Sequence, residues 1–119
     1  MWPLRLSPRQ RQGQAWEERA LHYLQQQGLS LVEANYRCKS GEIDLICRDG
    51  DTLVFVEVRH RADSGHGGAA ASITPGKIRR IVRAAQTYLM QFTHLPPCRI
   101  DVVAIDGTDI DWLQGAIEV

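Results

Sequence analysis

Acidic side chains interrupt two apolar segments of the chain, at positions from which they could bind a metal ion. Asp44 lies in the segment 42–48 and Glu57 in the segment 52–59. Two neighbouring carboxylates repel each other unless one is protonated or a cation lies between them, and Mg²⁺ or Mn²⁺ is the usual cation. Such an ion polarises a phosphoryl oxygen and lowers the pKa of a bound water, which is the chemistry of phosphodiester cleavage. We therefore predict Asp44 and Glu57 as metal ligands.

Arg59 stands two residues beyond Glu57, and alternate residues of a strand point to the same face. An arginine there could hold the scissile phosphate or the negative charge that develops on it. The same residue types allow a plainer interpretation, in which Glu42, Asp44, Glu57 and Arg59 form an exposed sheet face held by salt bridges. Residue types alone leave both interpretations open.

The relative position of the two acids depends on the turn between their strands. Asp49-Gly50-Asp51 separates the two apolar segments and is a strong hairpin signal. A two-residue turn at Asp49-Gly50, or a four-residue turn over 48–51, pairs Asp44 with Phe55. Asp44 and Glu57 then lie diagonally on one face, roughly 7–8 Å apart at the backbone. A three-residue turn would place them on opposite faces, so the metal-site hypothesis predicts an even-numbered turn.

A small set of helices and strands must position these acids. Apolar spacing and capping residues predict helices over 8–27 and from Thr74-Pro75 to Pro96-Pro97, and strands over 29–35, 42–48, 52–59, 98–105 and 110–119. Residues 1–7 are expected to be disordered, and the segment 60–73, rich in Gly, Ala and Ser, to form a mobile loop. The prediction is a single α/β domain over 1–119, with a mixed central sheet flanked by helices.

Composition and length limit the class of protein. With 119 residues, 44% of them hydrophobic, the chain can build one core. No apolar run approaches membrane-spanning length, and the first residues do not resemble an export signal. We therefore expect a soluble, cytoplasmic protein with no membrane partner. Cys38, Cys47 and Cys98 form no C-x-x-C pair, which argues against a disulfide framework and against a zinc ribbon.

Basic residues gather in one part of the chain although the formal net charge is zero. The segment 59–99 holds seven Lys and Arg residues against one acid, whereas the segment from 100 onward holds five acids and no Lys or Arg. This segregation is compatible with a basic binding face, and solvated helix surfaces produce the same counts. The predicted nucleic-acid-binding residues are Lys77, Arg79, Arg80, Arg83 and Arg61.

The segment Thr74-Pro75-Gly76-Lys77 begins the second predicted helix. Free backbone N–H groups at a helix start attract anions, and Lys77 adds a positive charge, so this segment could bind a phosphate. The alternative is an ordinary helix cap. The segment is not a Walker loop, because it lacks the G-x-x-x-x-G-K-[ST] pattern.

Several other residues are assigned to packing. Trp16 falls near the apolar stripe of the first helix and is predicted to pack against the core. His60 and His66 match no zinc-site spacing and are predicted to be exposed loop residues. Asp101 lies on an apolar strand and needs a partner, for which Arg99 on the same face is the predicted one.

Motifs spread along the chain resemble those of one bacterial family. The motifs are GEIDLI at 41–46, VFVEVR at 54–59, GQAWEERA at 13–20, TPGK at 74–77 with Arg80, and RIDVV at 99–103. Together they closely resemble the YraN family. That family is regarded as endonuclease-like and as related to Holliday-junction resolvases and to the PD-(D/E)xK nuclease superfamily.

The resemblance implies a restriction-endonuclease-like fold and particular roles for some residues. Asp44 and Glu57 would be the metal-binding acids, and Glu17 would be the acid from the first helix that faces the site. Arg59 stands where the superfamily has a lysine. Because an arginine effectively cannot lose its proton, the general base would be a metal-bound hydroxide or Lys77.

The sequence thus predicts a nuclease for branched or single-stranded nucleic acid, DNA in preference to RNA, with Mg²⁺ or Mn²⁺ as cofactor. A catalytically silent nucleic-acid-binding module on the same fold is the alternative, and a protein-interaction module is a third reading. Resolution of a junction would need two sites and therefore a homodimer.

Overall fold

The computed structural model describes residues 8–61 and 68–119, with side chains from residue 13 onward. In chain order the elements are helix α1 (Pro8–Gln26), strands β1 (Ser30–Cys38), β2 (Gly41–Asp49) and β3 (Thr52–Arg61), the short 3₁₀ helix η2 (Ala70–Ser72), helix α2 (Pro75–Leu89), and strands β4 (Cys98–Asp106) and β5 (Asp109–Ile117). Residues 1–7, predicted to be disordered, and the middle of the predicted loop 60–73 lie outside the described residues.

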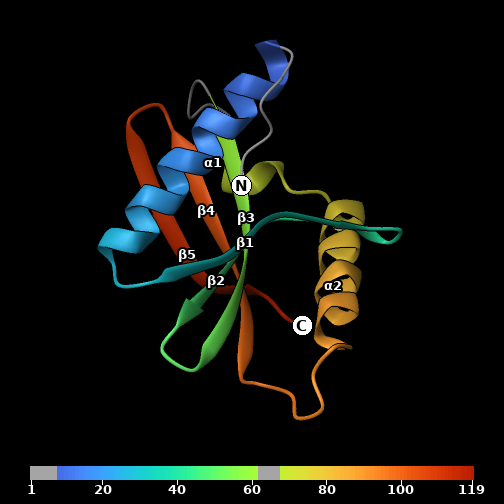
Figure 1. Cartoon of the computed structure of the whole chain (residues 1–119). Coiled ribbons are helices and arrows are strands. Elements are labelled where there is room, and N and C mark those ends of the chain that lie inside the picture. The colour runs from blue at the N-terminus through green and yellow to red at the C-terminus, as the bar shows by residue number, and fades with distance from the viewer. Residues whose placement is uncertain (1–7, 62–67) are drawn as a thin grey trace.

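The five strands form one sheet in the order β1-β2-β3-β4-β5. Strands β3 and β4 are parallel, and the other neighbours are antiparallel. A parallel pair needs a crossover connection, and α2 lies in the connection between β3 and β4. Figure 1 shows α1 on one face of the sheet and α2 on the other. This confirms the predicted mixed sheet flanked by helices and agrees with a restriction-endonuclease-like fold.

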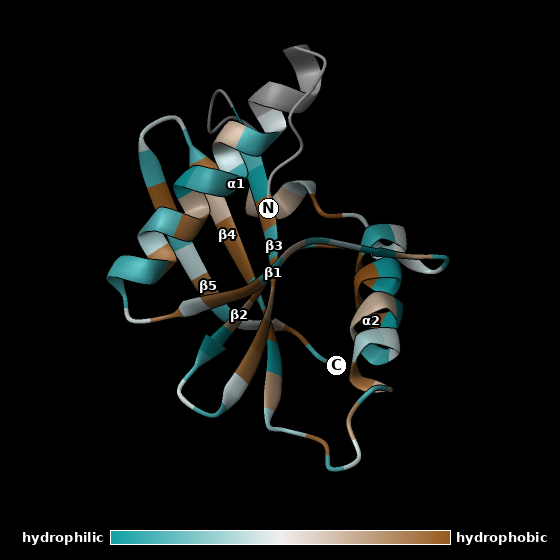
Figure 2. Cartoon of the chain, in the orientation of Figure 1, coloured by the Kyte–Doolittle hydropathy of each residue, from teal (hydrophilic) through white to brown (hydrophobic). Residues whose placement is uncertain are grey.

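Two apolar layers hold the helices onto the sheet. Along β3, Leu53 and Phe55 pack in the layer with α2, whereas Val54 and Val56 pack in the layer with α1. All four side chains are fully buried, as expected for a central strand covered on both faces. Figure 2 shows the apolar side of α2 turned toward the sheet. Trp16 packs against the α1 layer, which confirms its predicted role.

Helix α2 begins at an ordinary cap and ends earlier than predicted. The hydroxyl of Thr74 accepts a hydrogen bond from the backbone N–H of Lys77 at 3.2 Å. Of the two roles predicted for this segment, the structure therefore confirms the helix cap. The helix ends at Leu89 rather than near Pro96. The chain must turn back there to start β4 beside β3, where the backbone N–H of Leu53 donates to the Pro97 carbonyl at 2.8 Å.

Within residues 8–61 and 68–119, no helix is long and apolar enough to cross a membrane.

The bounds of the predicted loop 60–73 are wrong at both ends, because β3 continues to Arg61 and η2 covers Ala70–Ser72. His60 and Arg61 extend β3, because the parallel strand β4 offers them pairing partners as far as Asp106. Asp106 also accepts the backbone N–H of Ala69 at 2.8 Å, just before η2. These partners lie some forty residues away along the chain, and local sequence patterns do not reveal them.

The ring of His60 stacks on the indole of Trp16, with centroids 3.6 Å apart. His60 is half-buried in this contact between β3 and α1. The prediction of an exposed loop residue is therefore wrong for His60, because the strand continues beyond Arg59. His66 lies outside the described residues.

A buried carboxylate ties β4 to β5. Asp101 is fully buried and accepts hydrogen bonds from Arg99 Nε at 3.0 Å, from Trp112 Nε1 at 2.9 Å and from the backbone of Gly115 at 2.8 Å. The predicted pair of Arg99 with Asp101 is confirmed. Arg99 also contacts the partly exposed carboxylate of Asp49 at 3.0 Å. These hydrogen bonds replace the ones that the Asp101 carboxylate would make to water in the unfolded chain.

Asp101→Ala should lower the free energy of unfolding by about 2–4 kcal/mol, because three part-buried donors lose a charged acceptor that is fully buried. Asp49→Ala is the matched control, since it removes the other carboxylate from Arg99. The Asp49 side chain is 42% exposed, so this substitution should lower the free energy of unfolding by no more than about 1 kcal/mol. Urea unfolding of the two variants measures the difference, and equal losses would contradict this assignment.

Candidate acidic site between strands β2 and β3

A two-residue turn joins β2 to β3 and decides which faces the acids take. The turn is Gly50-Asp51, and Phe55 pairs with Ile46. The predicted pairing of Asp44 with Phe55 is therefore wrong by two residues. Gly50 has φ +61° and takes the first turn position, where tight hairpin turns need a positive φ. The turn remains even-numbered, and a slip of two residues does not by itself change the face that a side chain takes.

The two strands separate beyond the pair of Leu45 and Val56. From there β2 continues against β1, and β3 continues against β4. Asp44 lies at this fork, where its Oδ2 atom accepts the backbone N–H of Val58 at 2.8 Å. A side-chain oxygen thus replaces the carbonyl acceptor of a regular ladder, and the carboxylate lies between the strands.

The neighbouring strand is also irregular at this point. Asn35 of β1 lies opposite Asp44 and has φ +55°, a left-handed conformation that is uncommon outside glycine. On β2, Ile43 and Ile46 pack in the same layer as α2, although Leu45 between them packs in the layer of α1. Strict alternation is therefore interrupted at Asp44, and side chains from both faces of the sheet can reach it.

Three carboxyl groups meet at the fork. Glu57 is 2% exposed, and Asp44 and Glu17 of α1 are half-buried. The pKa of Glu57 is raised to about 8, and that of Glu17 is also raised to about 8. Burial is the larger cause for both groups, and the nearby Asp44 carboxylate is the second. Burial also raises the pKa of Asp44, and the hydrogen bond from Val58 offsets part of this effect. The structure thus brings together the three acids that the sequence singled out.

Two cations contact Glu57 from different elements. Its Oε2 atom lies 3.5 Å from Arg59 Nη1 and 3.8 Å from Lys77 Nζ. Arg59 also donates to Ser72, with Nε 3.0 Å from the hydroxyl and Nη2 3.3 Å from the carbonyl. Ser72 was not predicted, because nothing in its Ala- and Ser-rich segment distinguishes it. Since Glu57 is buried, the alternative of an exposed salt-bridged face does not describe it.

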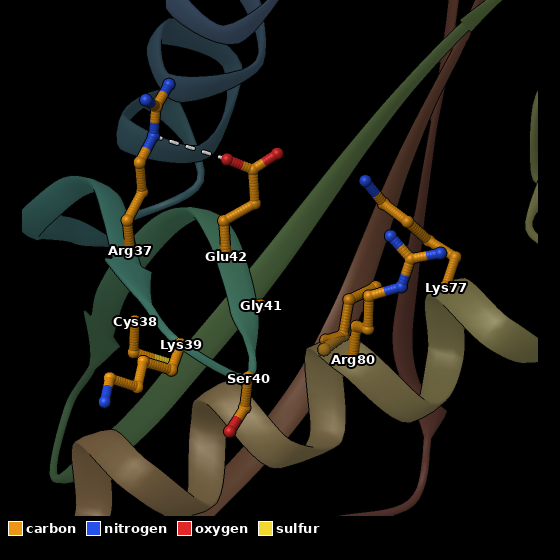
Figure 3. Close-up of a pocket in the computed structure, with 9 residues that line it drawn as sticks. Arg37, Cys38, Lys39, Ser40, Gly41, Glu42, Lys77 and Arg80 are labelled. Carbon is orange, nitrogen blue, oxygen red and sulfur yellow. Dashed lines mark ion pairs between the residues drawn. The ribbon is translucent and has the colours of Figure 1, made fainter.

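A cavity of about 320 Å³ adjoins the acids through Lys77. Helix α2 and the hairpin of β1 and β2 line it, with residues Arg37, Cys38, Lys39, Ser40, Gly41, Glu42, Lys77, Arg80 and Ile81. Figure 3 shows Lys77 and Arg80 on the helix facing Glu42 on the hairpin. Arg37 and Lys39 were not predicted, although two basic residues directly before the Gly41 motif were a usable signal.

The other predicted nucleic-acid-binding residues lie outside this cavity. Arg79 and Arg83 are exposed on α2, and Arg61 lies half-buried at the end of β3. Among the five predicted basic residues, the cavity therefore brings together only Lys77 and Arg80.

The acids have the donor chemistry that a hard cation needs. Across the described part of the chain, no group of three or more His, Cys, Asp and Glu side chains is arranged as a metal-ligand set. Mg²⁺, however, is commonly held by one or two carboxylates together with waters and substrate phosphates. Asp44 and Glu57 supply two such carboxylates. Burial, and after it the charge of Asp44, raises the pKa of Glu57, and a cation would offset that charge. The residues present fit Mg²⁺ or Mn²⁺ on this chemistry.

Comparison with known proteins identifies close relatives along most of the chain. The model of a family described as "Uncharacterised protein family UPF0102" matches residues 16–105. A UPF0102 protein of Herminiimonas arsenicoxydans is 60% identical over 92% of this chain and 89% of its own length. A UPF0102 protein of Janthinobacterium sp. (strain Marseille) is 56% identical over 98% and 97% of the two chains. A third, from Cupriavidus metallidurans, is 61% identical over 92% and 82%.

The raised pKa of Glu57 predicts how stability changes with pH. Folding raises this pKa from an ordinary 4.5 to about 8, so the folded state keeps a proton that the unfolded chain releases. Stability should therefore fall as the pH rises from about 4.5 through about 8 in the absence of metal. Glu57→Gln carries no such proton and should melt at a higher temperature than wild type near pH 9, with a smaller difference near about pH 5.

Thermal unfolding in EDTA across this range is the measurement. Glu33→Gln, which changes an exposed acid on β1, is the matched control and should follow the wild-type curve. Parallel curves for wild type and Glu57→Gln would contradict the raised pKa.

Proposed function

The chain belongs to the UPF0102 family, and from its buried acids and the resemblance of its motifs to the YraN proteins we propose that it is a metal-dependent nuclease. It would hydrolyse phosphodiester bonds of branched or single-stranded nucleic acid, with DNA preferred over RNA, as the resemblance to the YraN proteins implies. The observation that carries the proposal is the meeting of Asp44 and Glu57 at the fork of β2 and β3, beside Lys77.

Asp44 and Glu57 would hold a Mg²⁺ or Mn²⁺ ion. When bound, such an ion supplies a polarised phosphoryl oxygen and a water of lowered pKa. The pKa of Glu57, raised to about 8, supports this role, because the site binds a proton near neutral pH where a cation could take its place. Glu17 adjoins Asp44 from α1 and would position that carboxylate.

Arg59 and Lys77 would have different parts in the reaction. Arg59 is fixed between Ser72 and Glu57 and always keeps its proton, so it can stabilise negative charge but cannot act as a base. Lys77 approaches Glu57 from α2 and also lines the basic cavity. We assign to Lys77 the contact with the scissile phosphate and the proton transfer that Arg59 cannot make.

A second candidate function is nucleic-acid binding without hydrolysis, which Arg59 at the superfamily's lysine position favours. Such a protein would use Lys77, Arg79, Arg80, Arg83 and Arg61 as its binding residues, and its affinity would fall steeply with salt. Both functions would place the protein in the cytoplasm, and the free cysteines Cys38, Cys47 and Cys98 suit a reducing compartment. Action on a four-way junction would additionally require a homodimer.

Titration with Mg²⁺ or Mn²⁺ should raise the melting temperature of the wild-type protein and allow cleavage. The double variant Asp44→Asn/Glu57→Gln should lose the metal-induced shift and at least about 10²-fold of the cleavage rate. Both effects follow from loss of the two carboxylate charges. The assay uses duplex, single-stranded and branched DNA and RNA on the same samples, with Glu33→Gln as the control that keeps both properties.

Three results are informative. Saturable metal binding and cleavage that both disappear in the double variant would support the nuclease. Binding of nucleic acid without cleavage at any metal concentration would favour the second candidate. Neither binding nor cleavage would refute both.

Lys77→Met should lower the single-turnover cleavage rate by about 10²-fold at saturating substrate, because the site loses its only proposed proton-transfer amine. Arg83→Gln, one charge removed on the exposed side of the same helix, should leave the saturated rate unchanged. Melting temperatures of both variants check that they fold. A Lys77→Met rate equal to wild type would remove Lys77 from the reaction.

A further inference from the structure

The cavity beside the acids has two walls of different character. One wall is the first half of α2, with Lys77 and Arg80, and the other is the hairpin of β1 and β2, with Arg37 and Glu42. In Figure 3 the head groups of Lys77 and Arg80 lie together and face Glu42 across an open space. The cavity is therefore a space between a helix and a hairpin and not a patch on one helix.

The spacing of the two walls is set by a backbone contact. A Cβ atom on Gly41 would lie 2.6 Å from the carbonyl oxygen of Arg80, so only glycine allows the hairpin to approach α2 this closely. Arg80 and Arg83, one turn apart on α2, are both exposed, but Arg80 lines the cavity and Arg83 does not. The two arginines therefore differ in their position relative to the cavity.

The charge of the cavity suits an anion. Arg37, Lys39, Lys77 and Arg80 are lining cations, whereas Glu42 is the lining acid. Glu42 already forms an ion pair with Arg37, whose Nε atom lies 3.3 Å from Oε2 of Glu42. Within the described residues Arg80 has no ion pair, so its guanidinium is available for a phosphate.

The cavity also shares a wall with the acidic site. Lys77 lines the cavity and lies 3.8 Å from Glu57, and Glu42 is two residues from Asp44 on β2. An anion bound by Arg80 would therefore lie next to Lys77, which is assigned to the scissile phosphate at Asp44 and Glu57. In a nucleic-acid strand, this anion would be the phosphate that adjoins the scissile one.

The size of the cavity restricts what can enter it. Its volume of about 320 Å³ is at the small end of the range for small-molecule pockets, roughly 300–1,000 Å³. One unpaired nucleotide is a ligand of this size. A base-paired duplex, whose major groove alone is roughly 12 Å wide, is too large for this cavity and would remain outside.

We propose that this cavity is a subsite for one unpaired nucleotide, whose phosphate is held by Arg80 next to Lys77 and to the phosphodiester that is cleaved. The proposal rests on the proposed nuclease function and narrows its substrate to strands that offer an unpaired nucleotide at the site. It also separates Arg80, which contacts this phosphate, from Arg83, which provides only general attraction.

Binding without metal tests the subsite independently of catalysis. Fluorescence anisotropy in EDTA would measure the affinity of the full chain for an oligothymidine of roughly ten nucleotides and for a blunt duplex. Arg80→Gln should weaken single-strand binding about tenfold and lower the slope of log K against log salt by about 0.7. Arg83→Gln is the matched control and should weaken it less, whereas the two variants should affect duplex binding equally.

A second variant fills the cavity without removing a charge. Ser40 lines the cavity from the hairpin, and Ser40→Phe should weaken single-strand binding while leaving duplex binding as in wild type. This variant distinguishes a cavity from a general basic surface. Circular dichroism and melting temperatures confirm that each variant folds.

The outcomes separate this proposal from the nuclease function. Equal effects of Arg80→Gln and Arg83→Gln on the single strand, an unaffected Ser40→Phe, or no single-strand binding by wild type would each overturn the subsite. If wild type then still cleaves with metal, the nuclease function stands without it. A selective effect of Arg80→Gln in a protein that never cleaves would keep the subsite and overturn the nuclease.

Discussion

Asp44 takes the acceptor role that a backbone carbonyl normally has in a sheet, and the arrangement of the site follows from this replacement. Its carboxylate receives the N–H of Val58 at 2.8 Å, where β2 and β3 have already separated. An unpaired N–H in a buried strand costs free energy, so the fork needs an acceptor within it. With the strands apart, Glu17 reaches Asp44 from α1, and Lys77 reaches Glu57 from α2.

Such a site costs free energy, and the surrounding fold is built to tolerate it. Burial and mutual repulsion raise the pKa of both Glu17 and Glu57 to about 8. Arg59 and Lys77 offset part of this cost at Glu57, and Arg59 also ties the acid to Ser72 after the end of β3. The central strands β3 and β4, whose middle residues are buried, supply the frame. Fold stability alone does not require a buried acidic cluster, which is consistent with selection for function.

Charged residues have different roles in different elements. Of the basic residues of α2, Lys77 belongs both to the ion pair with Glu57 and to the wall of the cavity. The acid-rich C-terminal part uses Asp101 differently, as the buried acceptor that ties β4 to β5. Acids of similar burial therefore have opposite roles, because Asp101 has three kinds of donor around it and Glu57 has another carboxylate.

The sequence by itself determined the class of fold, most of the elements and the identity of the acids, since apolar alternation, helix caps and short motifs act between residues only a few positions apart. It placed Asp44 and Glu57 on one face but was wrong by two residues in the register, because Gly50 fits either position of a tight turn. It was also wrong about the ends of the loop 60–73 and the end of α2. Only the tertiary structure decided which partners these residues meet: Ser72 for Arg59, the hairpin opposite Arg80, and the shared burial that raises the carboxyl pKa values. These contacts join segments distant along the chain, and burial and charge coupling depend on separation in space.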